Sequence, residues 1–132
     1  PLLAAVLERP EESGSEAASE AAALALGQSR LPEALPLLQG YADRLPLGAQ
    51  RAALVAIAML RSPAAISDLC ARVAEAPISS AMDAVRALAM HRYDDGLRAR
   101  VGDLVRTRGH VALQREYGDA FGPVSVSNRR AD

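Results

Sequence analysis

The chain has 132 residues, of which half are hydrophobic and only 3% aromatic, and its 15 basic and 16 acidic residues leave a net charge of −1. This balance gives no general attraction to nucleic acid or to an anionic membrane, and no apolar run reaches the roughly 20 residues of a membrane-spanning helix. All fifteen basic residues are arginine, so a Walker-type phosphate loop or a lysine Schiff base is absent.

Cys70 is the only cysteine in the sequence, so an internal disulfide cannot form and a reducing compartment is indicated. The opening residues, PLLAAVLERP, lack the basic leader of a secretory signal. We therefore expect a cytoplasmic protein without a membrane segment. We also expect the chain to be one domain or a fragment of a larger protein.

Abundant alanine and leucine, with few strand-forming residues, favour an all-α fold. In the first half of the chain we expect helices over residues 1–8, 15–26, 32–45 and 49–60. Gly27 is expected to end the second of these helices, and Pro32 to begin the third. The fourth is apolar nearly all round, which indicates a buried helix.

Four more helices are expected in the second half, over residues 63–76, 79–92, 95–108 and 110–121. Ser62 caps the first of them, with Pro63 at the first helical position. Ser79 or Ser80 is expected to cap the second, which would place Asp83 in its first turn. Asp94 or Asp95 opens the third, and Gly109 ends it. We expect residues 123–132 to form a disordered C-terminal tail.

These eight helices form four hairpins, and the hairpins repeat at a nearly constant spacing. A short alanine-containing motif near the end of each second helix recurs along the chain, beginning at Ala25, Ala58, Ala89 and Ala120. Apolar positions of the first helices recur at one identical spacing, as Leu35, Ile66 and Leu97 and as Ala42, Val73 and Leu104. We call this spacing the repeat step. Its length is typical of stacked helical repeats, in which neighbouring units share one core.

The segment Ala22-Ala23-Leu24-Ala25-Leu26-Gly27 resembles the second helix of short HEAT and phycobilin-lyase-like HEAT repeats, and residues 34–38 resemble the first helix. The resemblance covers residues 1–122 and implies a right-handed α-solenoid of about four HEAT-like hairpins. It implies a partner-binding surface on the second helices, with Glu16, Glu20, Gln50, Arg51, Asp83 and Arg86 in reach of a partner. The aspartate and arginine that join neighbouring repeats in that family are not kept in register.

Other polar residues have structural explanations. Cys70, His91 and His110 lack metal-ligand spacing, and no cofactor is expected. Cys70 lies on an apolar stripe and is expected in the core, while His91 is expected at a helix C-terminus. The repeat step also relates three charged residues, which suggests ion pairs between neighbouring hairpins. These residues are Arg44, Glu75 and Arg106.

The C-terminal half is mildly basic, and four of its arginines are candidates for binding an anion. They are Arg92, Arg98, Arg100 and Arg106. The leading hypothesis from the sequence is a non-enzymatic scaffold that binds a protein partner. Two alternatives stay open, namely a nucleic-acid-binding HEAT-like array and an accessory or regulatory domain of an enzyme. The N-terminal end, which opens with Leu2-Leu3, is expected to abut further sequence or another copy.

Overall fold

The computed structural model describes residues 16–122, and the expected helix over residues 1–8 and the tail over 123–132 lie outside this range. The described residues form seven α-helices and one short 3-10 helix, with no β-strand among them, so the expected all-α class is confirmed. The helices are α3 (Glu16–Ser29), α4 (Ala34–Arg44), α5 (Arg51–Leu60), α6 (Pro63–Glu75), α7 (Ile78–Leu88), η1 (Ala89–His91), α8 (Asp95–Arg108) and α9 (Val111–Phe121).

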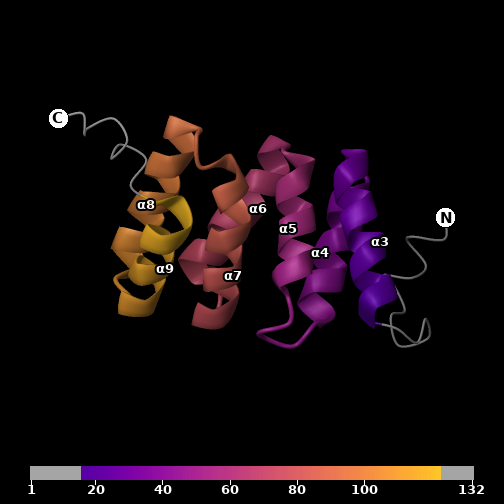
Figure 1. Cartoon of the computed structure of the whole chain (residues 1–132), viewed down its shortest axis with the longest axis horizontal. Coiled ribbons are helices and arrows are strands. Elements are labelled where there is room, and N and C mark those ends of the chain that lie inside the picture. The colour runs from indigo at the N-terminus through magenta and orange to yellow at the C-terminus, as the bar shows by residue number, and fades with distance from the viewer. Residues whose placement is uncertain (1–15, 123–132) are drawn as a thin grey trace.

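The helices stand side by side in a row that runs from α3 to α8 and α9 (Figure 1). Helix α3 packs on α5, α5 on α7 and α7 on α9, while α6 packs on α8. The two helices of each hairpin also contact each other, α4 with α5, α6 with α7 and α8 with α9. The turns alternate between two edges of the row, with residues 45–50 at the lower edge in Figure 1 and residues 89–94 at the upper edge.

Three of the expected helix boundaries are confirmed by hydrogen bonds or backbone angles. Ser62 Oγ accepts a hydrogen bond from the amide of Ala65 at 3.1 Å, and Asp94 Oδ1 accepts one from the amide of Leu97 at 3.1 Å. Gly109 ends α8 with φ 71°, in the left-handed region that suits glycine. These boundaries depend on neighbouring residues alone, which is why the sequence predicts them.

Gly27 does not end its helix, contrary to expectation, because α3 continues to Ser29. Its role is instead to let two helices approach closely. A β-carbon at position 27 would lie 2.6 Å from the carbonyl oxygen of Ala56 in α5. A glycine near a helix end therefore marks close helix packing here, not a helix stop.

The expected caps at Ser79 and Ser80 are also wrong. Helix α7 begins at Ile78, with Pro77 at the N-cap, so Asp83 lies beyond the first turn. Ser80 lies inside the helix and is buried. Its hydroxyl is used in a contact with the residue that precedes α5, which a local capping pattern cannot reveal.

The core is continuous across all seven α-helices, and six of the ten residues of α5 are buried in it. The repeat step of the first helices fails at α8, where Leu104 is only half-buried. Leu97, Val101 and Val105 are the buried residues of α8. They correspond to Ala65, Leu69 and Val73 of α6, each one residue beyond the repeat step, so the register of α8 is shifted by one position relative to that step. The shift arises in the connection through η1, because the N-caps of α6 and α8, Ser62 and Asp94, are also one residue further apart than the repeat step.

Candidate interaction surface

Gln50, one of the expected partner-binding residues, links two hairpins instead of facing solvent. Only 5% of its surface is exposed. Its Nε2 donates to the carbonyl oxygen of Ala42 at 2.8 Å, and its Oε1 accepts from Ser80 Oγ at 2.5 Å. A partner could therefore reach Gln50 only if α4, α5 and α7 separated.

Asp83 and Arg86 belong to a second polar link, between α7 and α9. Arg86 donates a hydrogen bond to Glu116 Oε1 at 2.9 Å, and its Nε forms an ion pair with Glu116 Oε2 at 2.9 Å. Arg86 also donates to Asp83 Oδ1 at 3.1 Å. Asp83 is 5% exposed, and its Oδ2 is buried without a hydrogen-bond partner in the described part of the chain. Burial raises the pKa of Asp83, and the nearby guanidinium groups of Arg86 and Arg51 offset part of that effect.

The remaining expected partner residues lie as follows. Glu20 and Arg51 are exposed, and Arg86 is half-buried. Glu16 begins α3, but its side chain is outside the described structure. The six residues therefore do not form one open surface, because Gln50 and Asp83 are used in packing.

Arg98, a candidate for anion binding, ties the last two helices together. Its guanidinium donates to the carbonyl oxygens of Phe121, Gly122 and Arg92. It also lies 5.6 Å from the centre of the Phe121 ring. Since these contacts occupy the planar donor groups, the role that this geometry supports for Arg98 is to hold the end of α9 against α8.

The other three candidate arginines differ in their surroundings. Arg92 donates to the carbonyl oxygen of Ala89 at 3.2 Å and lies over the ring of Tyr93 at 4.7 Å. Arg106 pairs with Asp103 in its own helix, and the described residues show no ion pair between Arg106 and Glu75. The Arg100 side chain is exposed and makes no hydrogen bond within the described residues. The set does not form a free cationic surface.

One ion pair and one hydrogen bond join α4 and α6, the first helices of two neighbouring hairpins. Gln39 of α4 donates to Asp68 of α6 at 3.0 Å. Arg72 of α6 contacts Asp68 at 2.9 Å and Asp43 of α4 at 3.3 Å. These contacts join neighbouring hairpins through their first helices.

Cys70 and His91 have the structural surroundings that the sequence suggests. Cys70 is buried, and desolvation raises the pKa of its thiol while the charge of Arg100 opposes that rise. His91 Nε2 lies 2.9 Å from the carbonyl oxygen of Ala58, near the C-terminus of α5. His91 therefore joins the ends of two successive second helices.

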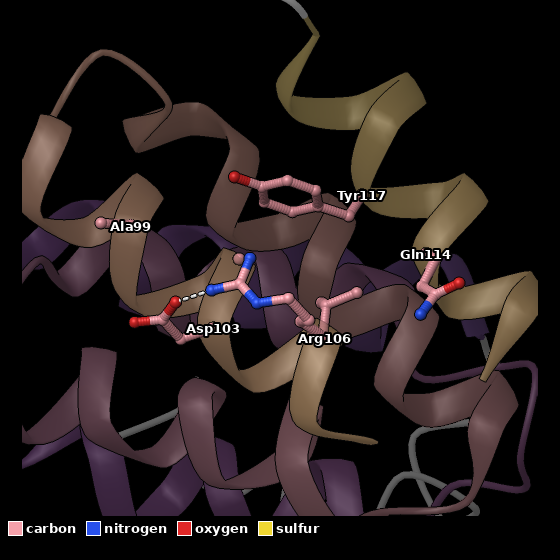
Figure 2. A pocket seen from close by; sticks show the side chains of 7 residues that line it. Ala99, Asp103, Arg106, Gln114 and Tyr117 are labelled. Atoms are coloured by element: carbon pink, nitrogen blue, oxygen red, sulfur yellow. Dashed lines mark hydrogen bonds and ion pairs between the residues drawn. The ribbon is translucent and has the colours of Figure 1, made fainter. Parts of the chain in front are cut away.

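A hollow of about 470 Å³ lies between α8 and α9 at one end of the row (Figure 2). Asp103 and Arg106 of α8 and Gln114 of α9 line it. Tyr117 crosses from α9 to α8, where its hydroxyl donates to the carbonyl oxygen of Arg98 at 3.1 Å. The hollow is open, and its ion pair is already satisfied, so it offers no unused charge to a ligand.

A second hollow, of about 200 Å³, lies at the ends of three successive second helices. Arg30, Arg61, Met59, Met90 and Gln28 line it, and they come from α3, α5, η1 and the residues that follow α3 and α5. The C-terminal ends of α3 and α5 lie at the upper edge of the row in Figure 1. We call this hollow the Arg–Met groove.

The arginines of the Arg–Met groove have an uncommon backbone conformation. Arg30 has φ 56° and Arg61 has φ 61°, so both lie in the left-handed region. A residue other than glycine in this region costs about 1 kcal/mol. Both side chains are exposed, and neither makes a hydrogen bond or ion pair within the described residues. The groove thus carries two cations that the fold itself does not use.

Sequence reasoning missed the Arg–Met groove, although a signal for it was present. The repeat step relates Arg30 to Arg61 and Met59 to Met90. The exposed positions that follow the same period as the apolar core positions therefore point to these residues.

Comparisons with protein-family models, with curated proteins and with solved structures found no match to this chain. The resemblance to HEAT repeats therefore depends on the residues quoted above. In residues 16–122, no helix is long and apolar enough to cross a bilayer. The same residues contain no group of three or more His, Cys, Asp or Glu side chains that could hold a metal ion.

Proposed function

We propose that this chain is a non-enzymatic protein-interaction scaffold, built as a short α-solenoid of HEAT-like hairpins. The observation that carries the proposal is that successive second helices pack in series, α3 on α5, α5 on α7 and α7 on α9. In a repeat array each unit contacts its neighbours, and stacking produces one extended surface.

Side-chain contacts between neighbouring hairpins support the repeat architecture. The pairs Gln50–Ser80 and Arg86–Glu116 each join positions 30 apart, and Gln39–Asp68 joins positions 29 apart. Contacts at nearly the same separation recur along the row, as expected when each hairpin is placed on the last in a similar way. The polar contacts also fix the register between hairpins, which apolar packing alone specifies less strictly.

The exposed apolar residues support a binding role. Four large hydrophobic side chains are exposed in the described residues, and two of them, Leu31 and Tyr93, lie in the connections that follow second helices. The same edge carries the Arg–Met groove. Aromatic residues, methionine and arginine are enriched at protein-binding surfaces, and this edge carries all three.

The proposal is tested by affinity purification of the intact protein, followed by titration of each captured candidate, separately purified, against the chain by calorimetry. A candidate that binds at a micromolar Kd or tighter, with a defined stoichiometry, supports the scaffold. The proposal fails if none of the purified candidates binds the chain directly. Reading the flanking sequence of the parent protein, where present, would separate a scaffold from an accessory domain of an enzyme.

A further inference from the structure

The Arg–Met groove combines two kinds of recognition in one place. Arg30 and Arg61 present guanidinium groups that are exposed and unpaired within the described residues. Met59 and Met90 line the same hollow and are half-buried, so part of each thioether side chain remains accessible. Methionine is flexible and polarisable, and it adapts to apolar side chains of different shapes.

The charged side chains that line the groove are all positive. Among the described residues, no carboxylate lines it, whereas two guanidinium groups do. Asp94 lies in the neighbouring hollow, which Arg61 and His91 also line. The Asp94 carboxylate already accepts the hydrogen bond that caps α8. An anionic group that enters the Arg–Met groove would therefore face cations without a competing carboxylate from this part of the chain.

The backbone at the two arginines is a further observation. The helix dipole favours a cation at this end of a helix, and neither α3 nor α5 has a basic residue in its last turn. A basic residue within the last turn would interact with the dipole equally well and would keep an ordinary helical φ. Arg30 and Arg61 instead occupy left-handed positions at which glycine is the favoured residue. These positions direct two arginines to the groove at a cost to folding.

We propose that the Arg–Met groove binds an acidic peptide segment of a protein partner, with aspartate or glutamate side chains on Arg30 and Arg61 and an apolar side chain between Met59 and Met90. Arginine binds a carboxylate through two parallel hydrogen bonds, which gives geometric specificity as well as attraction. A nucleic-acid strand fits less well, because its phosphates would meet the cations but the methionines offer no stacking surface for its bases. This inference rests on the proposed scaffold function and names the chemistry of its partner.

The test uses an array of peptides in which Asp or Glu is combined with Leu, Met or Phe at varied spacing. Each peptide that binds is then labelled with fluorescein and titrated with the full chain by fluorescence anisotropy. We expect Kd values on the order of 10–100 μM, which weaken as salt is added. The variant Arg30→Glu/Arg61→Glu is expected to weaken binding by about tenfold or more.

The matched control is Arg100→Glu/Arg115→Glu, which makes the same change in net charge at two exposed arginines outside the groove. It is expected to change the Kd by less than about threefold. Arg61→Gly provides a second check, since it removes the cation and relieves the backbone conformation. We expect it to raise the thermal midpoint by about 3 °C while it weakens peptide binding, so that a loss of binding cannot be attributed to unfolding.

The proposal is overturned if no acidic peptide binds, or if both charge-reversed variants weaken binding equally. It is also overturned if a labelled duplex DNA or single-stranded RNA binds through Arg30 and Arg61 and the peptides do not. A partner that binds the chain directly, and binds Arg30→Glu/Arg61→Glu equally well, would overturn this inference and leave the scaffold function standing. If no partner binds the chain at all, the scaffold function fails as well.

Discussion

The substitution Gly27→Ala tests how closely α3 and α5 are packed. The added β-carbon would lie 2.6 Å from the carbonyl oxygen of Ala56 and 2.9 Å from its Cα. Both are backbone atoms, so no side-chain rotation can relieve the overlap and the helices must move apart. Overpacking of this kind costs about 1–3 kcal/mol, whereas removing a glycine from a helix interior gains about 0.5–1 kcal/mol. We expect a net loss of about 1–2 kcal/mol in the free energy of unfolding.

Gly118→Ala is the matched control, because it makes the same chemical change inside α9. A β-carbon at position 118 would have no heavy atom within 4 Å, so only the gain from removing glycine applies. We expect the control to stabilise the chain by about 0.5–1 kcal/mol. The two substitutions should therefore change stability in opposite directions.

The assay is urea unfolding followed by circular dichroism at a helix-sensitive wavelength, with all three proteins measured in the same buffer. The difference between the two variants should be about 2 kcal/mol, which corresponds to roughly 5–10 °C in the thermal midpoint. If Gly27→Ala proved as stable as Gly118→Ala, the close contact between α3 and α5 would not exist. The packing of α3 on α5, the first contact in the series of second helices, would then be refuted.

Three further predictions concern the buried polar links. Burial raises the pKa of Asp83 above its ordinary value of 3.8, so the folded chain holds the proton more tightly than the unfolded chain, and the stability contributed by Asp83 falls as pH rises above about 4. Asp83→Asn cannot ionise, so its free energy of unfolding in urea should increase relative to that of the natural chain as pH rises above about 4. A difference between the two proteins that does not change with pH would contradict this. Arg98→Ala should cost about 2 kcal/mol and speed hydrogen exchange at the end of α9, whereas Arg100→Ala should stay within about 0.5 kcal/mol; equal effects would place Arg98 on a free surface. Gln50→Ala and Ser80→Ala should each lower the free energy of unfolding by about 1–2 kcal/mol. The double variant should lose about 1 kcal/mol less than the sum of the two single losses. Additive losses would show that the two side chains are not in contact.

The sequence determined the helical character of the chain and several helix boundaries. Ser62, Asp94 and Gly109 are recognised from their immediate neighbours, because a helix cap depends on hydrogen bonds within about one turn. The apolar stripe of α6 was also predictable, since Leu69, Cys70 and Val73 share one face at helical spacing.

The tertiary structure decided the roles of the polar residues. Gln50 and Asp83 look like surface residues on a repeat pattern, yet both are buried, because a neighbouring hairpin covers them. Arg98 looks like part of a cationic patch, yet its hydrogen bonds reach positions 23 and 24 further along the chain. A local pattern contains no information on partners so distant in sequence.

Gly27 and Arg61, at the ends of second helices, also have roles that only the tertiary structure reveals. A glycine there is typical of a helix stop, and an arginine is typical of an ordinary surface. Only the packed structure shows that α5 lies against Gly27 and that Arg61 has a left-handed backbone beside two methionines. The sequence thus determines where helices form through interactions within a turn, whereas the distances between helices decide which side chains are buried, paired or left open.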